Sequence, residues 1–243
     1  PHRDCENSAW FKSNRGVCAP AWRAPSRIGA HSEQHSPGDA SSGKVGGYDG
    51  KMTVPTLSLA RKSPLTLDTD VLVLGVRTTD DGPQLLWADS AFADLASSLA
   101  AIGVTGGVDE LGRVPASIGS ARSIALVGIG SSAPSEDTLR YAAGTATRRL
   151  TGVASLVLAL PTLSSAEVLA VLEGAAIGAY SYTAYRSSSL KKTMLPATEI
   201  TISTGIVLGG FPAGNDLLSR AAIVAAAVHS VRDLVNAPPS DLY

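Results

Sequence analysis

Three short apolar runs that contain or end in glycine or proline constrain the fold of this chain more than any other feature. They are VLVLGV at 71–76, IALVGIG at 124–130 and SLVLALP at 155–161. Continuous apolar runs of this length are typical of strands that are buried on both faces. A fold that contains them needs other elements packed on both sides of one sheet.

Weaker strand signals lie outside these three runs. Segments 56–60, 84–87, 199–203 and 206–208 are short and β-prone, and EITIS at 199–203 alternates polar with apolar residues. Alternation is typical of a strand with one solvated face, whereas the continuous runs indicate central strands. The mixture predicts a mixed sheet with weaker edge strands.

Four segments repeat apolar residues at the spacing of an amphipathic helix. Ser135 is the expected N-cap of the second, and Ser164 with Glu167 forms a capping box for the third. The fourth should end at Asn236, because Pro238 disfavours helix in the residue before it. The four faces are Phe92, Leu95, Leu99 and Ile102; Leu139, Ala143, Ala146 and Leu150; Val168, Leu172, Ala175 and Ala179; and Leu217, Ala221, Val224, Val228, Val231 and Val235.

Composition limits the class of protein. Hydrophobic residues make up 44% of the 243 residues and charged residues 17%, which fits a soluble globular chain. The formal net charge of −1 gives no overall attraction to nucleic acid or to an anionic membrane. The near-neutral charge therefore predicts no nucleic-acid partner. Since no apolar stretch reaches about 18 residues, we also expect no membrane span.

The first 51 residues differ from the rest. They are rich in Ser, Gly, Pro and Arg without a sustained period, which predicts disorder. The first methionine is Met52, so residues 1–51 are interpreted as a disordered segment or a misassigned upstream extension. His31 and His35 follow Cys5 and Cys18 in a zinc-like order. The cysteines are thirteen residues apart rather than about two to four, so unstructured residues are favoured over a metal site.

A glycine pair after the second apolar run is the candidate phosphate-binding turn. Gly128 and Gly130 lie between a strand and a helix, where backbone amides can hold a phosphate. The third glycine of the dinucleotide fingerprint is missing, because Ala133 and Pro134 follow. A tight structural turn is therefore favoured, and nucleotide binding remains the alternative.

Other charged residues give no catalytic set. Asp109 and Glu110, in a glycine-rich loop, could bind a cation, but a solvated surface loop is favoured. The basic pairs Arg148–Arg149 and Lys191–Lys192 are expected only to solvate a face, and His229 has no second histidine or cysteine near it in sequence. The chain contains no H-E-x-x-H, G-x-S-x-G or P-loop lysine motif.

Three stretches together resemble one known family. VRDLVNAPPSDLY at 231–243 resembles the junction between the N-terminal and catalytic domains of the leucyl, or cytosol, aminopeptidases. LEGAAIGAYSYTAYRSS at 172–188 and IALVGIG before DTLRYAAGTATRRL at 137–150 are similar to other parts of the same N-terminal domain. Tyr182 and Arg186 depart from the commoner Phe and Lys. The resemblance covers about 52–243.

The glycines in the second of these stretches also have a physical interpretation. Gly174 and Gly178 are four residues apart and leave a flat strip on one helix face, where we expect the sheet to approach closely. Tyr180, Tyr182 and Tyr185 should then end that helix with hydroxyl groups that reach water.

The resemblance implies the following fold and activity. The fold is an α/β macro-domain-like mixed sheet with helices on both faces at 52–213, followed at 214–243 by a linker helix and the start of the junction. The parent protein is a cytoplasmic, hexameric metalloaminopeptidase that releases N-terminal residues from peptides. Two divalent ions, manganese or zinc, belong to a catalytic domain that we expect to be missing from this fragment. No catalytic, cofactor-binding or metal-binding residue is assigned here, and the chain is expected to be inactive alone.

Two other classes of function remain open. A stand-alone macro-like module would bind ADP-ribose or a related nucleotide through the turn at 128–132. A noncatalytic regulatory or DNA-binding domain would need a basic surface stripe, which the near-neutral charge does not suggest.

Overall fold

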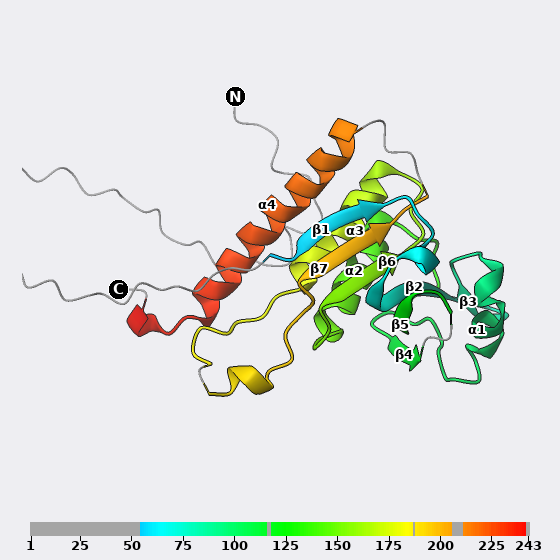
Figure 1. Cartoon of the computed structure of the whole chain (residues 1–243), viewed down its shortest axis with the longest axis horizontal. Helices are drawn as coiled ribbons and strands as arrows, with labels where there is room; N and C mark the ends of the chain where they lie inside the picture. The colour runs from blue at the N-terminus through cyan, green and yellow to red at the C-terminus, as the bar shows by residue number, and fades with distance from the viewer. Residues whose placement is uncertain (1–53, 116–117, 187, 206–210, 242–243) are drawn as a thin grey trace, which may run out of the picture. The chain divides into compact units, whose positions relative to one another are not determined.

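A computed structural model describes residues 54–115, 118–186, 188–205 and 211–241 (Figure 1). The chain divides into two units, 1–47 and 48–243, and every described residue lies in the second. The expectations for residues 1–51, including the cysteine and histidine cluster, lie outside the described residues. The strand expected at 206–208 also lies outside them.

The core of the second unit is one mixed sheet of seven strands. Its order is β1-β7-β6-β2-β5-β4, and β3 pairs with β2 beside this path. The first five strands in this order run parallel, whereas β4 is antiparallel to β5 and β3 is antiparallel to β2. The strands are β1 (Thr56–Ala60), β2 (Thr69–Thr79), β3 (Gly82–Leu85), β4 (Leu111–Pro115), β5 (Ala121–Gly130), β6 (Ser155–Ala159) and β7 (Glu199–Ser203).

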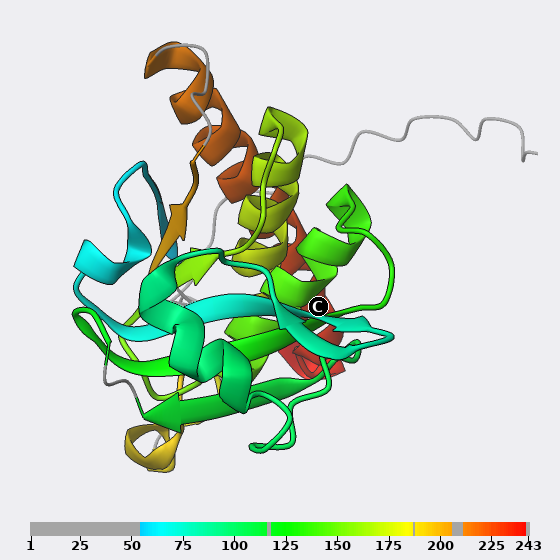
Figure 2. The same cartoon turned by 90° about the vertical axis from the view of Figure 1, so that its right-hand side faces the viewer.

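Both faces of the sheet are covered, as the continuous apolar runs predict. Val71 and Val73 of β2 point to one face, which carries α2 (Glu136–Arg149), α3 (Ser165–Gly178) and α4 (Phe211–Asn236). Leu72 and Leu74 point to the other face, where the short η3 (Ser90–Phe92) and α1 (Ala93–Ser98) pack. Figure 2 shows the three long helices on one side of the sheet and α1 on the other. The predicted mixed α/β architecture is confirmed.

Most predicted elements are present. The first two apolar runs lie in β2 and β5, the third forms β6 and extends two residues beyond it, and the segments 56–60 and 199–203 are β1 and β7. The segment predicted at 84–87 is instead the hairpin strand β3 at 82–85, which ends two residues earlier. Short η helices at Pro64–Thr66, Leu190–Lys192 and Pro239–Asp241 complete the described elements.

The predicted helix caps are largely correct. The Ser135 side chain accepts a hydrogen bond from the amide of Thr138, and the Ser164 side chain accepts one from Glu167. The box predicted at Ser164 is not closed, because the Glu167 carboxylate accepts from the amide of Leu163 instead. α4 ends at Asn236, as the following prolines predict.

Two predicted helix faces differ from the structure. α1 ends at Ser98, and Ile102 is 44% exposed in the turn that follows. On α4 the buried line is Ala221, Ala225 and His229, whereas Val231 and Val235 are 60% and 78% exposed. α4 packs on α3, and the small side chains of the two alanines allow that close contact.

The glycine strip of α3 also has a different neighbour from the one predicted. A Cβ built on Gly174 would lie 2.0 Å from the carbonyl oxygen of Arg140, and one on Gly178 would lie 2.5 Å from that of Gly144. Both of these carbonyls belong to α2. The strip therefore allows two helices, rather than a helix and the sheet, to meet at backbone distance.

Candidate functional site

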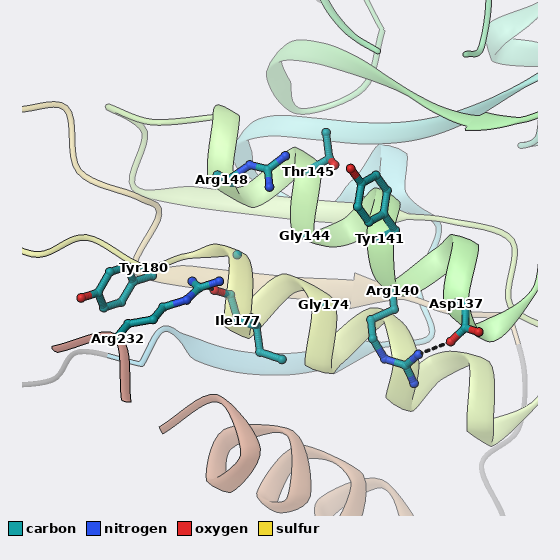
Figure 3. A pocket seen from close by; sticks show the side chains of 11 residues that line it. Asp137, Arg140, Tyr141, Gly144, Thr145, Arg148, Gly174, Ile177, Tyr180 and Arg232 are labelled. Carbon is teal, nitrogen blue, oxygen red and sulfur yellow. Dashed lines mark hydrogen bonds and ion pairs between the residues drawn. The ribbon is translucent and has the colours of Figure 1, made fainter. Parts of the chain in front are cut away.

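The crossing of α2 and α3 forms the floor of an open pocket of about 450 Å³ (Figure 3). The pocket extends to the last turns of α4, so three helices supply its walls. Backbone rather than side chains forms part of the floor, because three of the lining residues are glycines. The lining residues are Asp137, Arg140, Tyr141, Gly144, Thr145, Arg148, Gly174, Ile177, Gly178, Tyr180 and Arg232.

Carboxylates of the domain itself neutralise two of the three arginines on the rim. Arg140 donates to Asp137 at 2.7 Å and to Glu173 at 3.3 Å. Arg148 lies at the other end of the groove and donates to Asp109 at 3.3 Å. The pocket is therefore a polar rim around a largely neutral floor, rather than a strongly cationic anion site.

Asp109 fastens a loop onto α2. Its backbone φ is 63°, in the left-handed region that Asp tolerates better than most residues. Its carboxylate accepts hydrogen bonds from the hydroxyls of Tyr141 and Thr145 and from Arg148, while Arg149 donates to its backbone carbonyl. The bond from Tyr141 is the largest cause that holds the pKa of Asp109 below its usual value.

Glu110 organises the same loop from within. Its carboxylate accepts from the hydroxyl of Thr105 at 2.6 Å and from the amide of Gly107 at 3.0 Å. Burial acts to raise the pKa of Glu110, but these hydrogen bonds outweigh it and lower the pKa. The loop lies at the surface, as predicted for this acidic pair, since Asp109 is exposed and Glu110 half-buried, but both carboxylates also bind protein donors.

The glycine pair of β5 meets this loop instead of a phosphate. The amide of Gly128 donates to the carbonyl of Glu110 at 3.0 Å, and that of Gly130 donates to the carbonyl of Gly106 at 2.8 Å. A Cβ on Gly128 would lie only 1.8 Å from the carbonyl oxygen of Gly107. The amides of both glycines are therefore already hydrogen-bonded, which favours a structural role for the pair, although the two residues lie at the end of β5 rather than in the tight turn that was predicted.

A group of side chains joins the end of α3 to α4; we call it the α3–α4 clasp. Arg232 donates to the carbonyl of Ile177 at 3.0 Å, which satisfies one of the unpaired carbonyls at the end of α3. The hydroxyl of Tyr180 donates to Asp233 at 2.8 Å and accepts from Asn236 at 3.1 Å. The clasp comprises Ile177, Tyr180, His229, Arg232, Asp233 and Asn236.

His229 is the buried member of the clasp. It is 3% exposed, its Nε2 lies 3.4 Å from the carbonyl oxygen of Ile177, and its ring centroid lies 5.1 Å from that of Tyr180. Burial lowers the pKa of His229. Burial also raises the pKa of Tyr180, whose hydroxyl was expected to reach water and here binds Asp233 of α4.

The remaining predicted residues lie apart from this pocket. The rings of Tyr182 and Tyr185 contact each other with centroids 6.0 Å apart, and Lys191 and Lys192 are exposed on a short η helix. Sequence reasoning missed the loop-fastening role of Asp109. The spacing of Tyr141, Thr145 and Arg148, at four and three residues, was the available signal, because it places one polar stripe on α2.

The chemical capacity of the described part is limited. Among residues 54–115, 118–186, 188–205 and 211–241, no three His, Cys, Asp or Glu side chains are placed to hold a metal ion. The two divalent ions expected for the family therefore do not fit this part of the chain, and we derive no catalytic step through them. No helix in these ranges is long and apolar enough to cross a membrane.

Comparison with known proteins identifies the domain. Residues 75–189 match the family model described as the cytosol aminopeptidase family, N-terminal domain. The probable cytosol aminopeptidase of Leifsonia xyli is 47% identical over 193 residues, which are 79% of this chain and 37% of that protein. The corresponding protein of Clavibacter michiganensis is 40% identical over 79% of this chain and 38% of its own length. The chain thus spans less than two fifths of the length of these relatives.

Solved structures agree on the fold. A tomato leucine aminopeptidase mutant superposes with a TM-score of 0.61 at 19% identity, over 76% of this chain and 38% of that one. The bottromycin maturation enzyme BotP, solved in complex with Mn, gives 0.51 at 25% identity, over 72% of this chain and 33% of the enzyme. The match to the family model and the similarity to the curated relatives show that this chain belongs to the cytosol aminopeptidase family, in which it represents the N-terminal domain.

Proposed function

We propose that this domain is the non-catalytic assembly domain of a longer leucyl metalloaminopeptidase, which releases N-terminal amino acids from peptides in the cytoplasm. The observation that carries the proposal is the match of residues 75–189 to the N-terminal domain of the family. The length that the curated relatives have beyond the matched part, about three fifths of each, supports a second domain that does the chemistry.

The engagement of the acidic side chains supports the non-catalytic part of the proposal. Asp109 binds α2, Glu173 pairs with Arg140, and Asp70 accepts from the amides of Ala154 and Ser155. These three carboxylates thus have protein partners of their own. The two divalent ions, manganese or zinc, would bind outside the described residues, and the Mn complex of BotP supports manganese as one candidate.

Assembly is the role that remains for the domain within such a protein. We propose a hexamer, in which residues 52–213 form the N-terminal domain and 214–243 lead through α4 toward the catalytic domain. The groove over the α2–α3 crossing has a largely neutral floor inside a polar rim, an arrangement that protein–protein interfaces also show.

An activity comparison tests this function. The 243-residue chain and the polypeptide translated with the natural downstream sequence are each assayed on leucine 4-nitroanilide with added Mn²⁺ or Zn²⁺. Hydrolysis by the longer polypeptide alone, together with a mass of six copies by light scattering, is the expected result. Hydrolysis by the 243-residue chain, or none by the longer polypeptide with either metal, contradicts the proposal.

The nucleotide-binding alternative is less well supported. It requires free amides in the turn at 128–132, and the amides of Gly128 and Gly130 already donate to loop carbonyls. Phosphate would have to displace the loop that Asp109 and Glu110 hold in place.

A further inference from the structure

One face of α4 presents large apolar side chains to solvent. Ile223, Ala227, Val231 and Leu234 follow one another at spacings of four, four and three residues, so they form a single stripe along the helix. Ile223 is 70% exposed, Val231 60% and Leu234 59%, and Val235 beside them is 78% exposed. We call these five residues the α4 apolar stripe.

The stripe lies away from the side of α4 that packs on the domain. Ala221, Ala225 and His229 form the buried side, and the helix is therefore apolar on two faces. A helix of this kind in a water-soluble protein normally packs against a second partner, because clustered exposed apolar residues mark interaction surfaces. Figure 1 shows α4 alongside α3 and β1, with its last turns beyond the end of the sheet.

The clasp holds this surface in a fixed orientation. Arg232, Asp233 and Asn236 bind the end of α3 from within the same last turns that carry Val231, Leu234 and Val235. A rigid apolar surface loses little conformational entropy on binding, which favours its use for docking.

The size of the stripe argues for a covalently attached partner. From Ile223 to Leu234 it extends about 16 Å, and each large aliphatic side chain buries on the order of 100 Å². The whole stripe thus provides roughly half of the ~800 Å² per partner that a stable complex between separate molecules buries. A linked domain needs less area, because linkage gives an effective concentration in the millimolar range.

The position of the stripe indicates which linked domain packs on it. Three of its five members lie within six residues of Asn236, where α4 ends. In the curated relatives, the part matched by this chain is only 37% or 38% of the whole length. We propose that the α4 apolar stripe is the docking surface for the domain that follows α4 in the longer polypeptide. This inference rests on the proposed function, and it names the partner surface within the same protein.

Cysteine labelling tests the proposal. Val231→Cys is introduced with Cys5→Ser and Cys18→Ser, in the 243-residue chain and in the polypeptide translated with its natural downstream sequence. Ala96→Cys, an exposed position on α1 at the opposite face of the sheet, is the control. We expect maleimide to modify Val231→Cys at least about tenfold more slowly in the longer polypeptide, whereas Ala96→Cys reacts equally fast in both. Circular dichroism of each variant checks that it is folded.

Each other outcome overturns the proposal. Equal rates at Val231→Cys in both polypeptides show that no following domain covers the stripe. Slow labelling already in the 243-residue chain assigns a different occupant: a second copy if the rate depends on protein concentration, and residues 1–53 if it does not. A reading frame that stops after Tyr243 leaves no following domain.

The same samples separate this inference from the proposed function. If the longer polypeptide hydrolyses leucine 4-nitroanilide while its Val231→Cys still reacts rapidly, the proposed function stands and the docking inference is refuted. If Val231→Cys is protected in a longer polypeptide that hydrolyses no substrate, the docking inference stands and the proposed function is refuted.

Discussion

The carbonyl oxygen of Arg140 on α2 lies 2.0 Å from the position that a Cβ on Gly174 of α3 would occupy. The two helices therefore touch through their backbones at this point, and no side chain separates them. The same contact places backbone rather than side chains in part of the floor of the pocket. Substitution of the glycine tests how much of the domain depends on that contact.

Gly174→Ala should lower the free energy of unfolding by about 1–3 kcal/mol, because the new methyl group forces α2 and α3 apart. The higher helix propensity of Ala offsets only about 1 kcal/mol of this cost. Urea denaturation measures the difference. Gly214→Ala on α4 is the matched control, since its Cβ would lie 3.7 Å from Leu59 at ordinary contact distance. A Gly174→Ala chain as stable as the control would contradict the close contact.

Asp109→Asn should destabilise the domain in a pH-dependent way. The pKa of Asp109 is lowered in the fold, chiefly by the Tyr141 hydroxyl, so its ionised form stabilises the folded state. That contribution is present above the unfolded pKa of about 3.9 and is lost as the pH falls through the folded value. Asn tolerates the same left-handed backbone but carries no charge.

The measurement for this carboxylate is thermal unfolding of both chains from pH 7 down to pH 3. We expect the difference in stability between the native chain and Asp109→Asn to be constant at pH 5–7 and to shrink below about pH 4. A difference that stays the same at pH 3 would show that the charge of Asp109 does not contribute.

His229 should make stability depend on pH near neutrality. Burial lowers its pKa in the fold, so protonation favours the unfolded chain. Stability is therefore complete above the unfolded pKa of about 6.5 and falls below it, by at most about 1.4 kcal/mol per pH unit, until the folded pKa is reached. The neighbouring charges on the clasp, Arg232 and Asp233, act in opposite directions and do not change this sign.

The variant His229→Gln keeps a hydrogen-bond donor near the carbonyl of Ile177 but cannot titrate. Denaturant unfolding of both chains at pH 5, 6, 7 and 8 isolates the contribution of His229 from that of the other histidines. We expect the native chain to lose more stability than the variant between pH 7 and pH 5. Parallel pH profiles would mean that His229 is not buried as a neutral group.

Tyr180→Phe should loosen the end of α4. The substitution removes the hydroxyl that bonds to Asp233 and Asn236, at a cost of about 1 kcal/mol. Hydrogen exchange should accelerate at the amides of the last two turns of α4. Tyr141→Phe is the matched control: it removes the bond to Asp109, so exchange should accelerate in the loop at 103–110 and not in α4. Acceleration in α4 with both variants would refute a local clasp.

ADP-ribose should produce no heat of binding when it is titrated into the domain at micromolar concentrations. The amides of Gly128 and Gly130 that a phosphate would use already donate to the carbonyls of Glu110 and Gly106. Isothermal calorimetry makes the measurement. Saturable heat at these concentrations would instead revive the nucleotide-binding alternative.

The sheet was predictable from sequence because its strands are chemically distinct. A strand that is buried on both faces carries apolar residues at nearly every position, and VLVLGV, IALVGIG and SLVLALP have this composition. Local capping chemistry likewise placed the starts of α2 and α3 at Ser135 and Ser164, because such hydrogen bonds form within three residues of one another.

The candidate site was harder to predict, since it depends on contacts between distant segments. Gly174 has the same sequence signature whether it faces a sheet or a helix, and only the packed structure shows that α2 is its neighbour. Nothing in the sequence around Asp109 indicates that its carboxylate accepts a hydrogen bond from Tyr141, which lies 32 residues later. α4 carries apolar residues on two faces, so periodicity alone could not decide which face packs on α3.

The pairing of β1 with β7 affects how the chain folds as it is synthesised. Ser58 and Thr201 share a hydrogen bond of 2.7 Å across 143 residues of sequence, although β1 precedes every other strand of the described residues in translation. At about 5–20 residues per second, this first strand waits roughly 7–30 s for the strand beside it. The edge of the sheet that leaves the ribosome first is therefore the last to gain its partner, and nascent chains expose it throughout that interval.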